Sequence, residues 1–197
     1  MKNLIVLIGL LLISCTNEKV TKKKSKKEEK LFIKHYADNW IFPLGGLRAK
    51  GYYNAQEFTE NYHLGEDWNG IGGGNSDLGD SIQAIANGYV TFTQDLGGGW
   101  GKIVRITHYM ENEKQIESLY AHCNEILVKE NTWVKTGTNI ATIGNCHGLY
   151  PAHLHFEMRD IVGLPIGGGY SSDTEGYISP TKFINDHKDC VDPIPPK

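Results

Sequence analysis

From Ile82 onward, apolar and polar residues alternate with a period of two along most of the chain. This is the period of a half-buried β-strand, in which successive side chains point to opposite faces of a sheet. The alternation predicts an all-β fold: mainly antiparallel sheet in a sandwich-like or barrel-like core, with long loops and little helix. The predicted strands span residues 81–86, 89–93, 102–108, 115–122, 139–143 and 153–159.

Breaks in the alternation predict the other elements. Asn87-Gly88 separates the first two strands and is a dipeptide typical of a type I′ hairpin turn. Residues 180–186 have the pattern of a short helix, with Ser179 as its N-cap residue. Residues 33–60 carry several aromatic side chains in no regular order, so we expect a packed but irregular lead-in to the sheet.

The first 30 residues differ in composition from the remainder. Lys2 precedes an apolar run, 4–13, which is too short to span a bilayer and is followed by Ser14-Cys15. This ending resembles a bacterial lipobox, which implies cleavage before Cys15 and a lipid on its thiol. The alternative is an ordinary secretion signal followed by an incidental cysteine. Residues 16–30 are nearly devoid of apolar side chains, and we expect them to form a disordered tether.

The charge of the chain changes sign at the end of this tether. Residues 16–30 carry seven lysines against three glutamates, whereas residues 31–197 carry twelve basic and twenty acidic residues. The basic tether can lie against anionic lipid headgroups, or it can be a merely solvated spacer. The acidic remainder has no basic footprint for nucleic acid, which excludes that class of partner.

Histidines and one carboxylate recur at short spacings within the predicted sheet. His63 and Asp67 are four residues apart, His122 ends a strand, and His153 and His155 alternate on another. Two imidazoles and one carboxylate are a ligand set of catalytic zinc sites that keep a fourth position open. Because residues two apart share a strand face, one of the last pair can bind metal while its neighbour faces substrate. The chain has no HExxH motif, so a metalloprotease with a glutamate base is excluded and another zinc-dependent amide hydrolase is indicated.

The order of these motifs closely resembles that of the M23 (LytM/lysostaphin-type) zinc metallopeptidases. The resembling segments are HxxxD at 63–67, IQAIANGYV at 82–90, GWGKIVRITH at 99–108, YAH at 120–122, VKTGTNIATIG at 134–144 and HLHFEMR at 153–159. The resemblance implies that His63, Asp67 and His155 bind one zinc ion. It also implies that His122 and His153 are non-ligand active-site histidines in a groove whose floor is the sheet.

A chain of 197 residues fits one domain with appendages. We expect a signal peptide at 1–14, lipidated Cys15 with its tether at 15–30, a peptidase domain at 31–190 with its core at about 60–160, and a flexible tail at 191–197. The expected protein is a monomeric lipoprotein of the bacterial envelope, anchored to the membrane by its lipid. Its expected activity is zinc-dependent cleavage of peptidoglycan peptides.

Two other functions compete with this interpretation. A non-catalytic scaffold of the same family would bind the wall or activate another wall hydrolase, although this chain retains every ligand that such relatives typically lack. A lipoyl-type or biotinyl-type carrier is suggested by similar β-hairpin units, but the Asn87-Gly88 tip has no lysine to carry the group.

The sequence also leads to expectations for residues close to the predicted site residues. His108 ends a core strand and is expected to be structural, and Glu66 is expected to be solvated. Glu157 and Arg159 share a strand face with His155, so they either support the site or pair with each other. Cys123 is expected to point away from the face that carries His122, and it is not counted as a ligand.

Three cysteines follow the lipobox, at positions 123, 146 and 190, so at least one is unpaired. Loops at 70–80, 146–151 and 163–176 depart from the family pattern. We expect these loops to border the groove, which leaves open the bond that is cleaved.

Overall fold

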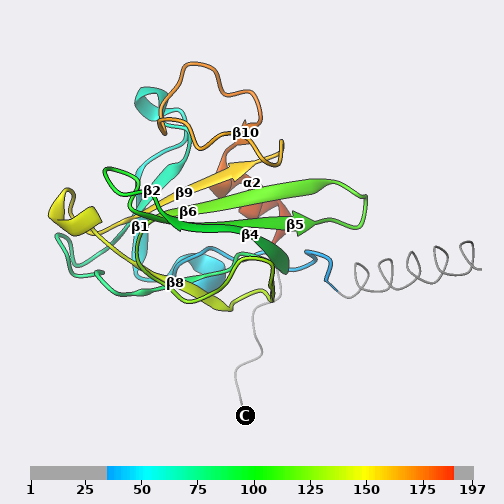
Figure 1. Ribbon diagram of the computed structural model, residues 1–197, viewed down its shortest axis with the longest axis horizontal. Helices are drawn as coiled ribbons and strands as arrows, with labels where there is room; N and C mark the ends of the chain where they lie inside the picture. Colours follow the sequence, from blue (N-terminus) through cyan, green and yellow to red (C-terminus); the bar gives the residue numbers. More distant parts are fainter. Residues whose placement is uncertain (1–34, 189–197) are drawn as a thin grey trace, which may run out of the picture. The chain divides into compact units, whose positions relative to one another are not determined.

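The computed structural model describes residues 35–188 (Figure 1). The predictions for the signal peptide, Cys15, the tether, Cys190 and the tail lie outside the described residues. Within residues 35–188, no helix has the length and apolar character needed to cross a membrane.

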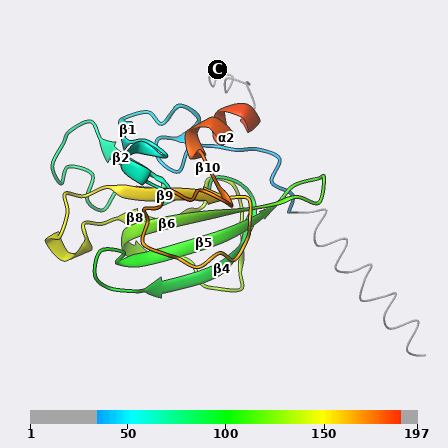
Figure 2. The same ribbon diagram turned by 90° about the horizontal axis from the view of Figure 1, so that it is seen from above.

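The described part of the chain is built around one antiparallel sheet of ten strands. The strands are β1 (Tyr52–Gln56), β2 (Glu66–Gly70), β3 (Ser81–Gln83), β4 (Gly88–Asp95), β5 (Lys102–Tyr109), β6 (Gln115–Ile126), β7 (Trp133–Val134), β8 (Asn139–Ile143), β9 (Leu154–Arg159) and β10 (Tyr177–Ile178). The main path runs β1-β2-β9-β6-β5-β4-β7, with β10 beside β9, and β8 pairing with both β6 and β3. Figure 2 shows β9, β6, β5 and β4 side by side in this order.

The predicted all-β class is confirmed, and the sheet is not closed into a barrel, since β1 and β7 end its main path. The pattern did not predict β1, β2, β7 or β10. Strands β7 and β10 have only two residues each, too few for an alternation to be read. Strand β1 lies at the edge of the sheet with half-buried and exposed side chains in turn, within the segment expected to be irregular.

The hairpin predicted at Asn87-Gly88 is wrong, because β3 pairs with β8 and β4 pairs with β5 and β7. A type I′ turn needs positive φ at both central residues, and neither residue has it. Instead the Asn87 amide donates to Tyr36 O (2.9 Å) and accepts from Thr136 N (3.1 Å). Gly88 is required by close packing, since a Cβ there would lie 2.7 Å from His108 Nδ1.

The two faces of β9 serve different purposes. Leu154, Phe156 and Met158 belong to the main hydrophobic core, which lies between one face of the sheet, the lead-in segment and the helix. The residues that alternate with them, His155 and its neighbours, lie on the other face. A smaller apolar cluster on that other face consists of Ile103, Leu119 and Ala121, with Phe92, Trp100 and Ile166 packed against it. The core therefore fixes β9 from behind while its opposite face remains available for polar groups.

The helix α2 (Pro180–His187) confirms the helix predicted at 180–186 and extends it by one residue. Ser179 is its N-cap, with its hydroxyl accepting from Lys182 N. Glu66 completes the cap, accepting from Thr181 N (3.0 Å) and from Thr181 Oγ1 (2.6 Å). The expectation that Glu66 is solvated is therefore wrong: its side chain is buried because α2 begins directly over β2.

Candidate metal centre

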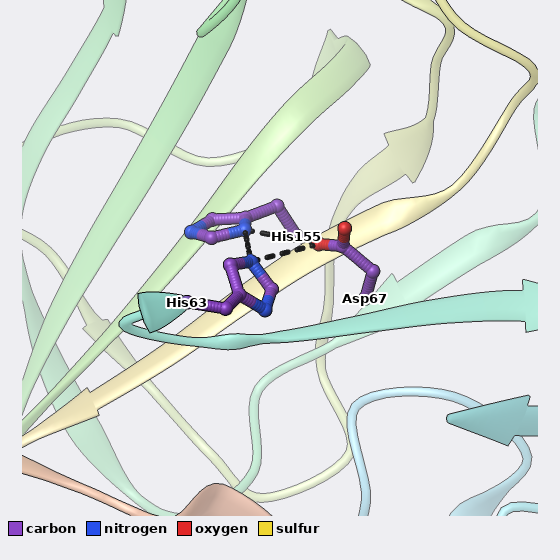
Figure 3. A group of neighbouring side chains, drawn as sticks. All are labelled: His63, Asp67 and His155. Carbon is purple, nitrogen blue, oxygen red and sulfur yellow. Dashed lines mark hydrogen bonds and ion pairs between the residues drawn. The ribbon is translucent and has the colours of Figure 1, made fainter. Parts of the chain in front are cut away.

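Three donor atoms of His63, Asp67 and His155 converge at one point (Figure 3). His155 Nδ1 lies 2.9 Å from His63 Nε2 and 3.0 Å from Asp67 Oδ1. The third separation, from His63 Nε2 to Asp67 Oδ1, is 3.4 Å. Two ligands at about 2.1 Å from a tetrahedral zinc ion are about 3.4 Å apart. The separation of His63 from Asp67 equals this value, and the two separations from His155 are shorter. The group could therefore hold a metal ion, and its donor set is one that zinc uses.

The register of the sheet brings these residues together. Strand β9 lies between β2 and β6, and His155 is paired with Asp67 on one side and Ala121 on the other. His63 precedes β2 and reaches the same place through a turn that contains Gly65. A Cβ at Gly65 would lie 2.7 Å from Phe156 O and 3.0 Å from His155 Cε1. Only glycine lets this turn approach β9 so closely.

The electrostatics of the group favour a cation. Burial alone would raise the pKa of Asp67, but the hydrogen bonds and charges of His155 and His63 hold it well below its usual range. Burial alone would lower the pKa of His155, but the carboxylates of Asp67 and Glu157 raise it to about 9. The side chains of His63 and His155 are almost fully buried. A proton or a metal ion at this point is therefore stabilised by a fixed negative charge.

The two other predicted histidines lie beside the group. The His122 ring is 4.6 Å from that of His153 and 5.6 Å from that of His155, between centroids. Nδ1 of His122 lies 3.3 Å from Trp100 O, and Nδ1 of His153 lies 2.8 Å from Pro151 O. Because a carbonyl only accepts, each neutral ring carries its proton on Nδ1 and has a free lone pair on Nε2.

The surroundings of the His122 and His153 rings differ. Burial, with the neighbouring imidazoles of His155 and His153, lowers the pKa of His122 to about 3. Nε2 of His153 instead lies 3.9 Å from Asp67 Oδ2. His153 therefore faces a carboxylate, whereas His122 has the thiol of Cys146 beside it, with Sγ 3.2 Å from its Nδ1.

A β-bulge sets the direction of His122. Lys102 pairs with Cys123 and Val104 pairs with Tyr120, so one residue of β5 faces both residue 121 and His122. His122 adopts a left-handed conformation, with φ of 59°. Such a bulge redirects a side chain out of the regular alternation. Among residues 35–188, one group of three side chains could hold a metal ion. Cys123 does not belong to this group, and its thiol donates to Tyr120 O.

A cavity of about 270 Å³ opens over these side chains. Four predicted site residues line it, and the other lining residues are aromatic or glycine: Asp67, His122, His153, His155, Trp100, Tyr150, Tyr170, Gly99, Gly168 and Gly169. Two of the three unusual loops contribute to this lining, 146–151 through Tyr150 and 163–176 through its glycines and Tyr170. The third, 70–80, contacts the segment before β9 instead, where Asn75 Oδ1 accepts from Ala152 N.

Tyr150 and Tyr170 were not singled out from the sequence. The Tyr170 ring lies 5.1 Å from that of His63, and the Tyr150 ring lies 5.5 Å from that of His122. Both belong to loops that depart from the family pattern, and this departure is the one feature of the sequence that could have pointed to them.

His108 lies outside the cavity. It is fully buried and within hydrogen-bond distance of Asn87 O and Ser118 Oγ, in the structural role that was expected.

Comparisons with known proteins agree with this geometry. The profile of peptidase family M23 matches residues 63–168. Lipoprotein NlpD of Yersinia enterocolitica is 40% identical over 81 residues, which cover 41% of this chain and 78% of that protein. The murein hydrolase activator NlpD of Escherichia coli is 38% identical over 81 residues, covering 41% of this chain but 20% of the relative.

A solved structure extends the likeness to the fold. A zinc containing peptidase from Vibrio cholerae matches with a TM-score of 0.50 and 24% identity, covering 63% of this chain and 37% of that one. The chain thus spans about a fifth of the length of the E. coli relative and about a third of the Vibrio peptidase. Because the family profile covers more than half of its residues, this chain belongs to peptidase family M23.

Proposed function

We propose that this protein is a zinc-dependent endopeptidase that cleaves peptide bonds of bacterial peptidoglycan and is held at the envelope by a lipid on Cys15. One observation carries the proposal: the donor atoms of His63, Asp67 and His155 converge, and Asp67 and His155 line the same cavity as two histidines with free Nε2 atoms. A site that had lost its activity would have no reason to keep both sets of residues in register.

His63, Asp67 and His155 would hold the metal through Nε2, Oδ1 and Nδ1. A zinc ion there supplies polarisation of the scissile carbonyl and lowers the pKa of a water toward neutrality. The three side chains supply one negative charge among them, which leaves a net positive charge to face the substrate. The burial of His63 and His155 excludes bulk water from their side of the site, so this charge is weakly screened there.

His153 and His122 would move the protons. With its lone pair on Nε2, and with Asp67 3.9 Å away to stabilise the imidazolium, His153 is suited to accept the proton of the attacking water. His122 is suited to contact the developing oxyanion or the departing amine once a proton reaches its own Nε2. The two backbone carbonyls that accept from the Nδ1 atoms keep both rings in this orientation.

A peptide substrate suits the rest of the cavity. Glycines and the flat rings of Trp100, Tyr150 and Tyr170 form its walls, and they carry no charge that would select a nucleotide or phosphate. One relative named as a lipoprotein and one named as a murein hydrolase activator support a location and a substrate at the cell wall. The lipobox at Cys15 provides the anchor.

The family also offers a second candidate function, activation of another wall hydrolase. The observation that favours it is the 38% identity with a protein named as a murein hydrolase activator. An activator works through its surface, whereas a peptidase needs its ligands. Substitution of one ligand therefore separates the two functions.

The test incubates the full chain with purified sacculi, measuring release of new amines and identifying the muropeptides by mass spectrometry. Wild-type protein loaded with zinc should release amines, and Asp67→Asn should not. Asp186→Asn, at an exposed carboxylate that pairs with Lys182, should behave as wild type. Folded, zinc-loaded wild-type protein that releases no amines would rule out the peptidase. Stimulation of a second hydrolase by both variants would then identify an activator.

A further inference from the structure

Four charged side chains lie buried on the face of the sheet that carries His155. They are supplied by β5, β6 and β9, and we refer to them as the ion network: Arg105, Glu117, Glu157 and Arg159. Three of them are at most 1% exposed, and the side chain of Arg105 is 11% exposed. Two positive and two negative charges balance, as a buried group of this size requires.

The ion network begins at the metal centre. Glu157 Oε1 accepts a hydrogen bond from His155 Nε2 at 3.0 Å. A neutral imidazole has one proton, so a proton held on Nε2 leaves the lone pair on Nδ1. Nδ1 is the atom that faces His63 and Asp67. The Glu157 carboxylate therefore fixes both the orientation of His155 and the tautomer that can bind a metal.

Arg159 holds Glu157 in place. Its Nε and Nη2 atoms donate to Glu157 Oε2 at 2.9 and 2.5 Å, and its guanidinium lies 5.0 Å above the centre of the Tyr177 ring. A carboxylate buried without this partner would be strongly unfavourable. The position of the His155 ring thus depends on an arginine that contacts none of the three predicted ligands.

The other end of the ion network holds a loop. Arg159 Nη1 donates to Leu164 O at 3.1 Å, and Arg105 Nη2 donates to the same oxygen at 3.0 Å. Glu117 Oε2 accepts from Gly163 N at 3.2 Å. In Figure 2 this loop, drawn in orange between β9 and β10, extends over β6 and β5. Its backbone is therefore bound to charges of the sheet beneath it.

The same loop continues into the wall of the cavity. Gly167 O accepts from Trp100 Nε1 at 3.1 Å, and the two residues that follow, Gly168 and Gly169, line the cavity. The Trp100 ring lies 3.5 Å from the position of a Cβ at Gly169. A continuous set of contacts thus runs from the predicted ligand His155, through the ion network, to the surface that a substrate would contact.

We propose that Glu157 is a positioning residue for the metal ligand His155, and that Arg159 couples it to the cavity wall at 163–169. This inference rests on the proposed metal site and deepens it. It assigns the ion network two measurable effects: Glu157 raises the affinity for zinc, and Arg159 keeps the loop ordered. Neither effect requires turnover to be measured.

The first experiment measures zinc affinity of the full chain by competition with a chromophoric chelator. Glu157→Gln keeps the shape of the side chain but removes its charge, and the dissociation constant for zinc should rise by about 10-fold to 100-fold. Glu125→Gln, at an exposed carboxylate near the end of β6, is the matched control and should leave the affinity unchanged. The visible absorption of bound Co²⁺ should shift in Glu157→Gln alone.

The outcomes distinguish this inference from the proposed function. Loss of a residue that orients a metal ligand typically weakens metal binding by about 10-fold or more. If the dissociation constant of folded Glu157→Gln for zinc is within about twofold of the wild-type value, Glu157 does not position His155. If wild-type protein itself binds no zinc, the metal site and the proposed function fail together, and the inference with them.

The second experiment tests the loop by hydrogen exchange of Arg159→Lys. A lysine keeps the charge but cannot reach the carboxylate and the loop carbonyls together. Exchange of amides at 163–169 should become at least tenfold faster, while exchange in β5 and β6 stays at the wild-type rate. Unchanged exchange at 163–169 would overturn the coupling, and uniformly faster exchange would assign Arg159 a general role in stability instead.

Discussion

The fully buried His108 should make the protein lose stability in mild acid. Its Nδ1 lies 3.0 Å from Asn87 O, and its Nε2 lies 2.8 Å from Ser118 Oγ, whose oxygen is 3.1 Å from Tyr120 Oη. Burial lowers the pKa of His108 from 6.5 to about 4. In the unfolded chain the ring takes up its proton near pH 6.5, so protons favour the unfolded state below that pH.

The magnitude follows from this difference in pKa. Above pH 6.5 the protonation of His108 does not change the free energy of unfolding. This free energy decreases as the pH falls from 6.5 to about 4. A difference of about 2.5 pKa units corresponds to about 3 kcal/mol of unfolding free energy over the whole window. About 2 kcal/mol of this should be lost by pH 5.

The assay is urea unfolding at pH 7 and pH 5, followed by tryptophan fluorescence with a chelator present so that metal binding does not contribute. The perturbation is His108→Gln, which keeps a neutral donor and acceptor and has no proton to gain. The variant should be less stable at pH 7, because ring packing against Trp40 is lost. Its loss of stability between pH 7 and pH 5 should nevertheless be about 2 kcal/mol smaller than that of wild type.

The control is His147→Gln, which replaces an exposed histidine and should keep the wild-type dependence on pH. The reasoning is refuted if His108→Gln loses as much stability as wild type over this interval. In that case other buried groups, and not the neutral ring of His108, determine the response to acid.

Three further changes test separate parts of the structure. Gly65→Ala should destabilise the fold by about 1–3 kcal/mol in urea unfolding and weaken zinc binding, because its Cβ would contact Phe156 O. Ser179→Ala should cost about 1 kcal/mol in thermal unfolding by removing the N-cap of α2, and an unchanged melting temperature would contradict the cap. Trp100→Phe removes the hydrogen bond to Gly167 O and should speed hydrogen exchange of the loop without changing zinc affinity. Equal exchange rates in the two proteins would show that this bond does not order the loop.

The sequence by itself determined the fold class, six of the ten strands and the histidines and carboxylate of the site. Alternation along β5, β6, β8 and β9 reports which face of the sheet each side chain occupies, and this property is local to each strand. It also placed Glu157 and Arg159 on the face of His155, and the structure shows that they pair with each other and that Glu157 contacts that ring. The spacing of the histidines and Asp67, with their order in the chain, identified every histidine and carboxylate that lines the cavity near the metal centre.

Only the tertiary structure decided how these parts meet. The predicted hairpin at Asn87-Gly88 does not form because the Asn87 side chain hydrogen-bonds to residues 36 and 136, which are far away in the sequence. Glu66 became buried for the same kind of reason, since the helix that covers it begins more than a hundred residues later. The direction of His122 depends on a bulge opposite β5. Pairing, burial and tautomer are set by neighbours across the sheet, and a pattern read along one segment contains no information about them.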